Sequence, residues 1–124
     1  MSLLGIDVGT TGCKAAAFSA DGRLLAGAYR EYPTLHPAPD RAELDGETVW
    51  SAVQSVIAET AAGTGRDPVT ALSVSSMGEA MAPVTRDRTL AGRSILSSDT
   101  RGGELLDPIR KAYTDEAFYA INPN

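Results

Sequence analysis

A short polar turn between two apolar segments constrains this chain more than any other feature. Residues 3–8 are apolar except for Asp7, residues 9–12 read Gly-Thr-Thr-Gly, and residues 13–18 are again mostly apolar. Two apolar runs of strand length, joined by so few residues, predict two antiparallel strands with a tight turn between them. The alanines at 15–17 leave a helical alternative open for the second run, because alanine is the strongest helix former.

A second turn extends this pattern into a meander. Asp21-Gly22 is a strong hairpin signal, since both residues tolerate positive φ angles, and an extended run follows at 24–32. The sequence therefore predicts three antiparallel strands in succession. Residues 33–44 contain three prolines and are predicted to form an exposed loop in which His36 is solvated.

A helix is predicted after this loop. Asp45 suits its N-cap and residues 61–63 suit its end. The apolar residues between these ends recur at helical spacing and form a core-facing stripe: Val49, Trp50, Val53, Val56 and Ile57. Two later methionines, Met77 and Met81, are also predicted to fill the core.

The remaining segments alternate between extended and helical patterns. Residues 72–75 alternate in polarity as a strand does. Segments 83–85 and 94–96 flank a polar tip and predict a hairpin, and residues 104–119 predict a helix with a break at Pro108. The order is three strands, helix, strand, hairpin and helix, which predicts an α/β fold.

Composition narrows the functional classes. The chain has 124 residues, enough for one domain, and its formal net charge of −5 argues against general affinity for nucleic acids or anionic membranes. No stretch approaches the roughly 20 apolar residues of a membrane helix. The single cysteine, Cys13, excludes an internal disulfide and a multi-cysteine zinc site, and is predicted to be a buried apolar residue. These features predict a cytoplasmic protein.

The first turn carries the residue types that bind phosphate. Glycines let backbone N–H groups approach an anion closely, and threonine hydroxyls can donate to phosphate oxygens. Asp7, at the end of the first strand, can orient the water ligands of Mg²⁺. The turn is not a Walker A loop, because Cys13 separates Gly12 from Lys14, and it lacks the spacing of a dinucleotide fingerprint. The sequence favours a phosphate-binding turn over the alternative, an ordinary hairpin turn rich in Gly and Thr.

Four segments together resemble one protein family, and they follow the family's order along the chain. Residues 6–14 resemble the first phosphate motif of the actin/Hsp70/sugar-kinase superfamily. Three others narrow the resemblance to the FGGY carbohydrate kinases: residues 42–50, with Ala-Glu-Leu-Asp before Val-Trp, residues 72–80, Leu-Ser-Val-Ser-Ser-Met-Gly-Glu-Ala, and residues 94–101, Ser-Ile-Leu-Ser-Ser-Asp-Thr-Arg. The resemblance covers nearly the whole chain.

This resemblance implies a ribonuclease-H-like fold of the actin-like ATPase type. It also implies transfer of the γ-phosphoryl group of ATP to a hydroxyl of a sugar or polyol, with ATP and Mg²⁺ as cofactors. Asp7 would be the catalytic residue that positions Mg²⁺. The residues implied to hold the nucleotide phosphates are Gly9, Thr10, Thr11, Gly12 and Lys14. The residues implied to contact the acceptor sugar are Gly78, Glu79 and Asp99.

Some positions depart from the family pattern or keep a second interpretation. The Gly-Glu pair at 78–79 matches neither the Arg-Glu of glycerol kinases nor the Met-His of xylulokinases, and Ser97 stands where relatives usually carry tryptophan. These departures leave the identity of the sugar open. Lys14 can equally point to solvent, and Asp99 can instead form a structural ion pair with Arg101.

Members of the FGGY kinase family consist of two ribonuclease-H-like domains, and their chains are several times longer than this one. The resemblance implies that residues 1–124 form part of the N-terminal kinase domain, without its second half and without the C-terminal domain. The chain alone is expected to be inactive, and its uncovered sheet surface is expected to favour self-association. Two alternatives stay open: the small-domain part of another actin/Hsp70-type ATPase, or a non-enzymatic truncated module.

Overall fold

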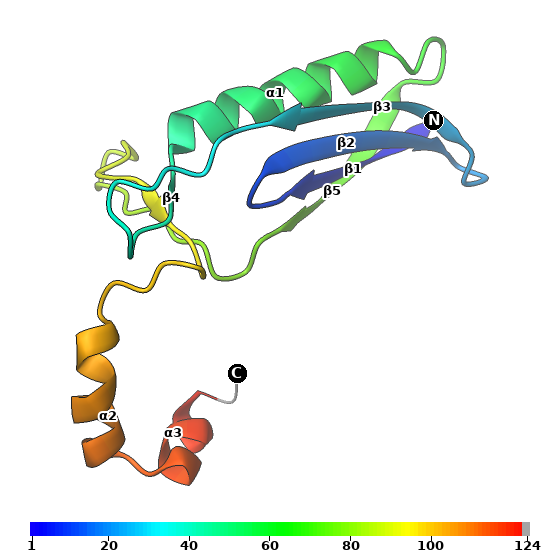
Figure 1. The fold of residues 1–124 in the computed structure, drawn as a ribbon. Coiled ribbons are helices and arrows are strands. Elements are labelled where there is room, and N and C mark those ends of the chain that lie inside the picture. The colour runs from blue at the N-terminus through cyan, green and yellow to red at the C-terminus, as the bar shows by residue number, and fades with distance from the viewer. Residues whose placement is uncertain (123–124) are drawn as a thin grey trace.

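The computed structural model describes residues 1–122, and a four-stranded sheet forms the main layer of its body (Figure 1). In sheet order the strands are β3 (Leu24–Glu31), β2 (Gly12–Ser19), β1 (Ser2–Val8) and β5 (Val69–Ser76). The first three pair antiparallel, which confirms the predicted meander, and β5 pairs parallel to β1. The alanine run of β2 is therefore a strand and not a helix.

Helix α1 (Gly46–Ala62) lies across one face of this sheet and contacts β2 and β3 (Figure 1). Its N-cap is Asp45, as predicted, and the Asp45 carboxylate accepts a hydrogen bond of 2.8 Å from the backbone N–H of Thr48. The buried residues of the sheet and helix include Leu4, Ile6, Cys13, Ala15, Ala17, Val53 and Val56. Those from β2 are small, so the helix can lie close to the strand, and Cys13 is buried as predicted.

The proline-containing segment is more ordered than predicted. Leu35 and Glu43 exchange two backbone hydrogen bonds of 2.8 and 2.9 Å. The short strand β4 (Glu43–Leu44) then pairs antiparallel with β6 (Ser94–Ile95). The prediction of an exposed loop over 33–44 was wrong at its end, because Glu43 and Leu44 are buried against the body. His36 is exposed, as predicted.

The predicted hairpin between 83–85 and 94–96 was wrong in its pairing. The polar tip does form a turn, since the Thr85 N–H donates to the Thr89 carbonyl over 2.9 Å. However, Val84 pairs with Leu90, and β6 pairs with β4 and with Met81. Met81 is also exposed, which overturns its predicted place in the core, whereas Met77 packs against the core.

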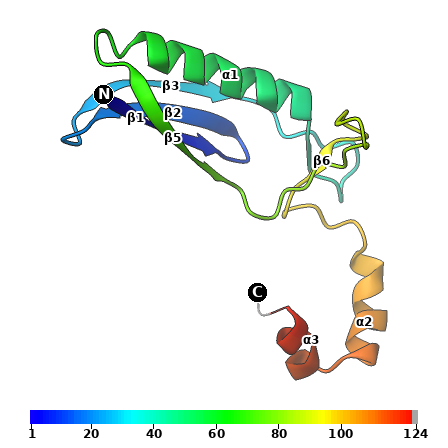
Figure 2. The same cartoon turned by 180° about the vertical axis from the view of Figure 1, so that it is seen from behind.

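The carboxyl-terminal segment is helical but breaks at a different place than predicted. It consists of η1 (Gly103–Leu105), α2 (Leu106–Ala112) and α3 (Asp115–Ile121), which project from the sheet body (Figures 1 and 2). Pro108 does not interrupt the chain, because it lies in the first turn of α2, where backbone N–H groups have no intrahelical partner. The break follows α2, and the Thr114 hydroxyl caps α3.

An apolar groove of about 560 Å³ runs between α1 and β5. Trp50 lines it and is 56% exposed, so the prediction that Trp50 faces the core was wrong. Leu72 and Val74 of β5 line the same groove and are also exposed. The reason is that α1 packs over β2 and β3, which leaves β5 without a covering helix on this face.

Candidate active site

The predicted phosphate turn is the tight connection between β1 and β2. The Gly9 N–H donates to the Gly12 carbonyl over 2.9 Å and closes the turn around Thr10 and Thr11, both of which are exposed. Position 12 admits only glycine without movement, because a Cβ there would lie 2.6 Å from the Arg30 carbonyl oxygen. The structure therefore brings together the four turn residues that the sequence singled out.

Two residues that sequence reasoning missed hold this turn from the end of β3. The Tyr32 hydroxyl donates to the Gly9 carbonyl over 2.6 Å, and the Tyr32 N–H donates to the Thr11 carbonyl over 3.2 Å. The Thr34 hydroxyl donates to the Thr10 carbonyl over 3.4 Å. Burial raises the pKa of Tyr32 to about 12, so its hydroxyl stays protonated at neutral pH. The predicted meander could have indicated these two residues, because it brings the end of β3 beside the first turn.

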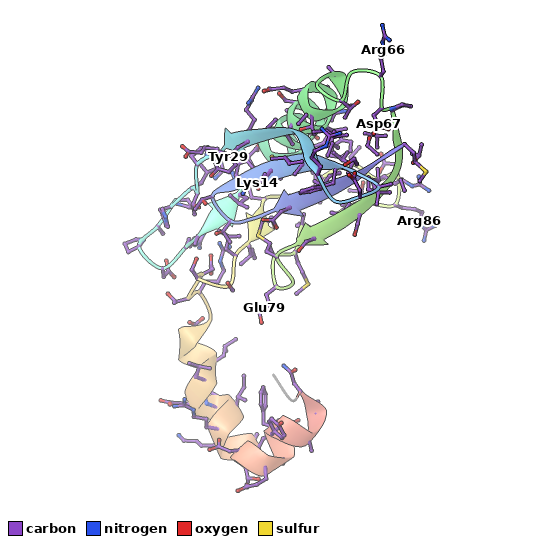
Figure 3. All side chains as sticks on the ribbon, turned by 90° about the vertical axis from the view of Figure 1, so that its right-hand side faces the viewer. Lys14, Tyr29, Arg66, Asp67, Glu79 and Arg86 are labelled. Carbon is purple, nitrogen blue, oxygen red and sulfur yellow. The ribbon has the colours of Figure 1, made fainter. Side chains whose placement is uncertain are left out.

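Asp7 and Lys14 lie on the face of the sheet opposite α1. They are direct cross-strand partners in the β1–β2 register, and both side chains are exposed. Together with Ser73 and Ser75 of β5 they line a depression of about 310 Å³. Lys14 also lies beside Tyr29, its partner on β3, as Figure 3 shows. The two charged residues predicted from the first motif therefore share one surface.

Two of the three residues predicted to contact the sugar, Gly78 and Glu79, share a pocket with the phosphate turn. A pocket of about 290 Å³ is lined by Thr10, by Gly78 and Glu79 in the loop after β5, and by Ser97. Glu79 is exposed, and Figure 3 shows its side chain at the tip of that loop, directed away from the sheet. A Cβ at Gly78 would meet no atom within 4 Å, so this wall of the pocket is open. Thr10 of the turn and Glu79 of the loop after β5 therefore line the same pocket.

Asp99 has a different environment from the other predicted sugar contacts. It does not line the pocket, and its side chain is only 1% exposed. Its carboxylate accepts hydrogen bonds from the Ala42 N–H over 2.8 Å and from the Arg101 guanidinium over 2.7 and 2.8 Å. Arg101 donates a further hydrogen bond of 2.5 Å to Glu43. These interactions match the structural alternative that the sequence had left open for Asp99.

Asp99, Glu43 and Arg101 form a hydrogen-bonded cluster, and the hydrogen bonds shift the pKa of each member. Donation by Arg101 holds the pKa of Asp99 well below its usual range and also lowers the pKa of Glu43. The same two carboxylates raise the pKa of Arg101. The cluster is therefore fully ionised at neutral pH, and it ties the segment before α1 to the loop after β6.

Magnesium coordination can be tested against the residue types present. Among residues 1–122, no group of three or more His, Cys, Asp or Glu side chains is placed to hold a metal ion. Asp7 supplies one exposed carboxylate at the end of β1. Such a sparse donor set fits Mg²⁺, which is commonly bound through one or two carboxylates, water and the phosphates of a substrate.

Comparisons with known proteins agree with this geometry. Residues 2–124 match the model of the N-terminal domain of the FGGY family of carbohydrate kinases. A probable L-xylulose kinase from Haemophilus influenzae is 34% identical over 120 residues, which span 95% of this chain and 25% of that relative. A glycerol kinase from Gloeobacter violaceus is 43% identical over 61 residues, or 49% of this chain and 12% of the relative.

Solved structures show the same fold. The xylulose kinase from Rhodospirillum rubrum superposes with a TM-score of 0.88 at 27% identity, over 97% of this chain and 25% of that one. The glycerol kinase from Plasmodium falciparum, solved with ADP, gives a TM-score of 0.86 at 15% identity, over 95% of this chain and 24% of that one. The chain thus has the actin-like ATPase fold and spans about a quarter of the length of these relatives. Because the family model matches almost every residue, the chain belongs to the FGGY family of carbohydrate kinases.

Proposed function

We propose that this chain is the amino-terminal part of an ATP-dependent kinase that phosphorylates a hydroxyl of a sugar or polyol. The observation that carries the proposal is the pocket shared by Thr10 of the phosphate turn and Glu79 of the loop after β5. The Thr10 hydroxyl can donate to phosphate oxygens, and the Glu79 carboxylate can accept hydrogen bonds from hydroxyl groups. Such a pocket suits a reaction in which a phosphate group and an alcohol must meet.

The acceptor end is set by the loop after β5. The Glu79 carboxylate accepts hydrogen bonds, and with two oxygens it can accept from two neighbouring hydroxyls at once. Gly78 and Ser97 carry small or no side chains on the walls beside it. We infer that Gly78 and Glu79 contact the acceptor, and we assign Asp99 to holding the adjacent loop, because its carboxylate is already engaged by Ala42 and Arg101.

The nucleotide end is set by the first turn. Gly9, Thr10, Thr11 and Gly12 would hold the phosphates, and Lys14 would add positive charge from the neighbouring strand. Asp7 is the residue that would hold Mg²⁺, which when bound neutralises charge on the phosphate oxygens. In the transfer, an acceptor hydroxyl oxygen forms a bond to the γ-phosphorus while the bond from that phosphorus to the β,γ-bridging oxygen breaks. ADP leaves, and the hydroxyl proton passes to a base that we place outside this chain.

The test is ADP release by the full-length protein across a panel of pentoses, hexoses and polyols, with MgATP in excess. We expect one group of acceptors to stimulate turnover, and the isolated chain to show no sugar-dependent turnover, because phosphoryl transfer requires all its groups to be held together. Failure of every acceptor with the full-length protein would contradict the kinase assignment. Robust sugar-stimulated turnover by the isolated chain would contradict its assignment as an incomplete part.

We also propose that the uncovered apolar groove favours self-association of the isolated chain. Trp50, Leu72 and Val74 expose apolar surface there, and β5 is an edge strand whose backbone groups are open on one side. Light scattering should give a mass above that of the monomer, and a monodisperse monomer would contradict this.

No helix within residues 1–122 is long and apolar enough to cross a membrane. We infer a cytoplasmic location, where ATP is available.

A further inference from the structure

The three peptide groups of the phosphate turn share one orientation. The carbonyl of Gly9 is bound by the Tyr32 hydroxyl, that of Thr10 by the Thr34 hydroxyl, and that of Thr11 by the Tyr32 N–H, over 2.6, 3.4 and 3.2 Å. Successive carbonyls therefore all face the segment that follows β3. Their partners lie on two residues, Tyr32 and Thr34, which are separated only by Pro33.

The orientation of the carbonyls determines that of the N–H groups. No cis peptide occurs among the described residues, and in a trans peptide the C=O and the next N–H point in opposite directions. The N–H groups of Thr10 and Thr11 therefore point away from Tyr32 and Thr34. Neither N–H donates to a backbone carbonyl among residues 1–122. Both donors are available to a ligand on the open side of the turn.

We propose that Tyr32 and Thr34 are positioning residues that set this turn for phosphate binding, by holding its carbonyls away from the ligand and so aiming the Thr10 and Thr11 N–H groups at it. The inference rests on the proposed function, since it takes the turn to be the nucleotide-phosphate site. The ligand class is the polyphosphate of a nucleotide. If a carbonyl turned outward, its negative end would face the anion and one N–H donor would be lost.

Burial makes Tyr32 suited to this role. Its side chain is 5% exposed, and its hydroxyl, which stays protonated at neutral pH, donates over 2.6 Å. A buried donor with one acceptor within reach holds that acceptor more firmly than an exposed donor does, because water does not compete for the hydrogen bond. Thr34 makes a longer bond of 3.4 Å from a less buried position, so we expect it to contribute less.

The test measures the two N–H groups directly. The full-length protein is labelled with ¹⁵N-threonine, and the amide signals of Thr10 and Thr11 are followed during titration with MgATP and, separately, with inorganic tripolyphosphate. Both signals should shift in the wild type. Tyr32→Phe should raise the dissociation constant read from them about three- to tenfold, and Thr34→Val by a smaller factor. Thr34→Val keeps the test possible if Tyr32→Phe does not fold.

Matched controls separate positioning from general stability. Thr70→Val removes a threonine hydroxyl that donates to the Ser2 carbonyl over 3.3 Å, at the far end of β1. Tyr113→Phe removes the hydroxyl of an exposed tyrosine in the carboxyl-terminal helical segment. Both should lower or preserve the melting temperature without changing the dissociation constant.

Each remaining outcome is decisive. If the wild-type signals shift but Tyr32→Phe and Thr34→Val bind both ligands as tightly as the controls, the positioning role is overturned while the phosphate site stands. If the wild-type signals of Thr10 and Thr11 respond to neither ligand, the turn is not a phosphate site, and the proposed nucleotide role is overturned with it.

Discussion

Replacing Gly12 with alanine should destabilise the protein, because three atoms already occupy the place of a Cβ. That atom would lie 2.6 Å from the Arg30 carbonyl oxygen, and 2.6 and 2.8 Å from the hydroxyl oxygen and adjacent ring carbon of Tyr29. The Tyr29 ring is 47% exposed and can tilt away. The Arg30 carbonyl cannot move freely, because it belongs to the backbone of β3 and lies opposite Cys13 in the sheet register.

The expected cost follows from how far the two strands must separate. Normal van der Waals contact requires several tenths of an ångström more than the 2.6 Å available, so the end of the β2–β3 ladder must open. Overpacking of this kind costs about 1–3 kcal/mol. Gly5→Ala is the matched control in the neighbouring strand, because the nearest atom to a Cβ there is the Ala16 carbonyl oxygen at 3.9 Å. Restricting the unfolded chain should make Gly5→Ala neutral or stabilising by up to about 1 kcal/mol.

Urea unfolding followed by circular dichroism measures both changes. With a slope of about 1–3 kcal/mol per molar urea, Gly12→Ala should lower the midpoint by roughly 1 M, and Gly5→Ala should leave it unchanged or raise it. In the full-length protein, Gly12→Ala should also raise KM for ATP, because the displaced atoms adjoin the phosphate turn. Equal midpoints for the two variants would refute the argument from close packing at position 12.

Three further predictions concern the charged residues. Asp7→Asn in the full-length protein should lower kcat by about a hundredfold or more with an unchanged melting temperature, since it removes charge without changing shape, and near-normal turnover at saturating MgATP would contradict the assignment. Glu79→Gln should raise KM for the acceptor about ten- to a hundredfold and leave KM for ATP nearly unchanged, whereas equal effects on both would indicate a structural role. Because Arg101 lowers the pKa values of Asp99 and Glu43 in the folded state, their stabilisation is present above about pH 4 and is lost as the pH falls through the folded values. Arg101→Met should therefore flatten the loss of stability in acid, and an unchanged acid profile would contradict this.

Local patterns predicted the parts of the fold that depend on neighbouring residues. The turn at 9–12 lies between strands that pair with each other, so its flanking apolar runs were sufficient to identify it. The start of α1 was equally local, because the Asp45 cap binds Thr48, only three residues away. The alanines of β2 were ambiguous for the opposite reason. Their state depends on α1, which lies far along the chain and packs against them.

Long-range pairing explains the predictions that failed. β6 pairs with β4 across about fifty residues, and no local signal at 94–96 distinguishes that partner from the nearer segment at 83–85. Trp50 fits a helical apolar stripe, but the stripe does not show that α1 covers β2 and β3 and leaves β5 open. Periodicity shows which side of a helix is apolar, and it does not show how much of that side finds a partner.

The distinction between local patterns and long-range contacts also applies to the candidate site. Thr10 was predicted as a phosphate contact from the residue types of the first turn, and Glu79 as a sugar contact from the family resemblance. Both residues line one pocket. Asp99 was harder, because a carboxylate in a loop suits either a sugar or an arginine. Only its burial and its bonds to Ala42 and Arg101 distinguish the two.

The residues that would contact ligands are exposed, whereas the residues that hold the surrounding backbone in place are buried. Thr10, Thr11 and Glu79 are exposed, whereas the Tyr32 and Asp99 side chains are almost completely buried and bind backbone groups of neighbouring segments. A buried polar side chain must have its hydrogen bonds satisfied, so its partners limit the backbone to few arrangements. An exposed side chain imposes no such limit and stays free to bind a ligand. The motifs therefore indicate the proposed binding groups, whereas the backbone around them is held by buried residues outside the first turn, which only the three-dimensional structure identifies.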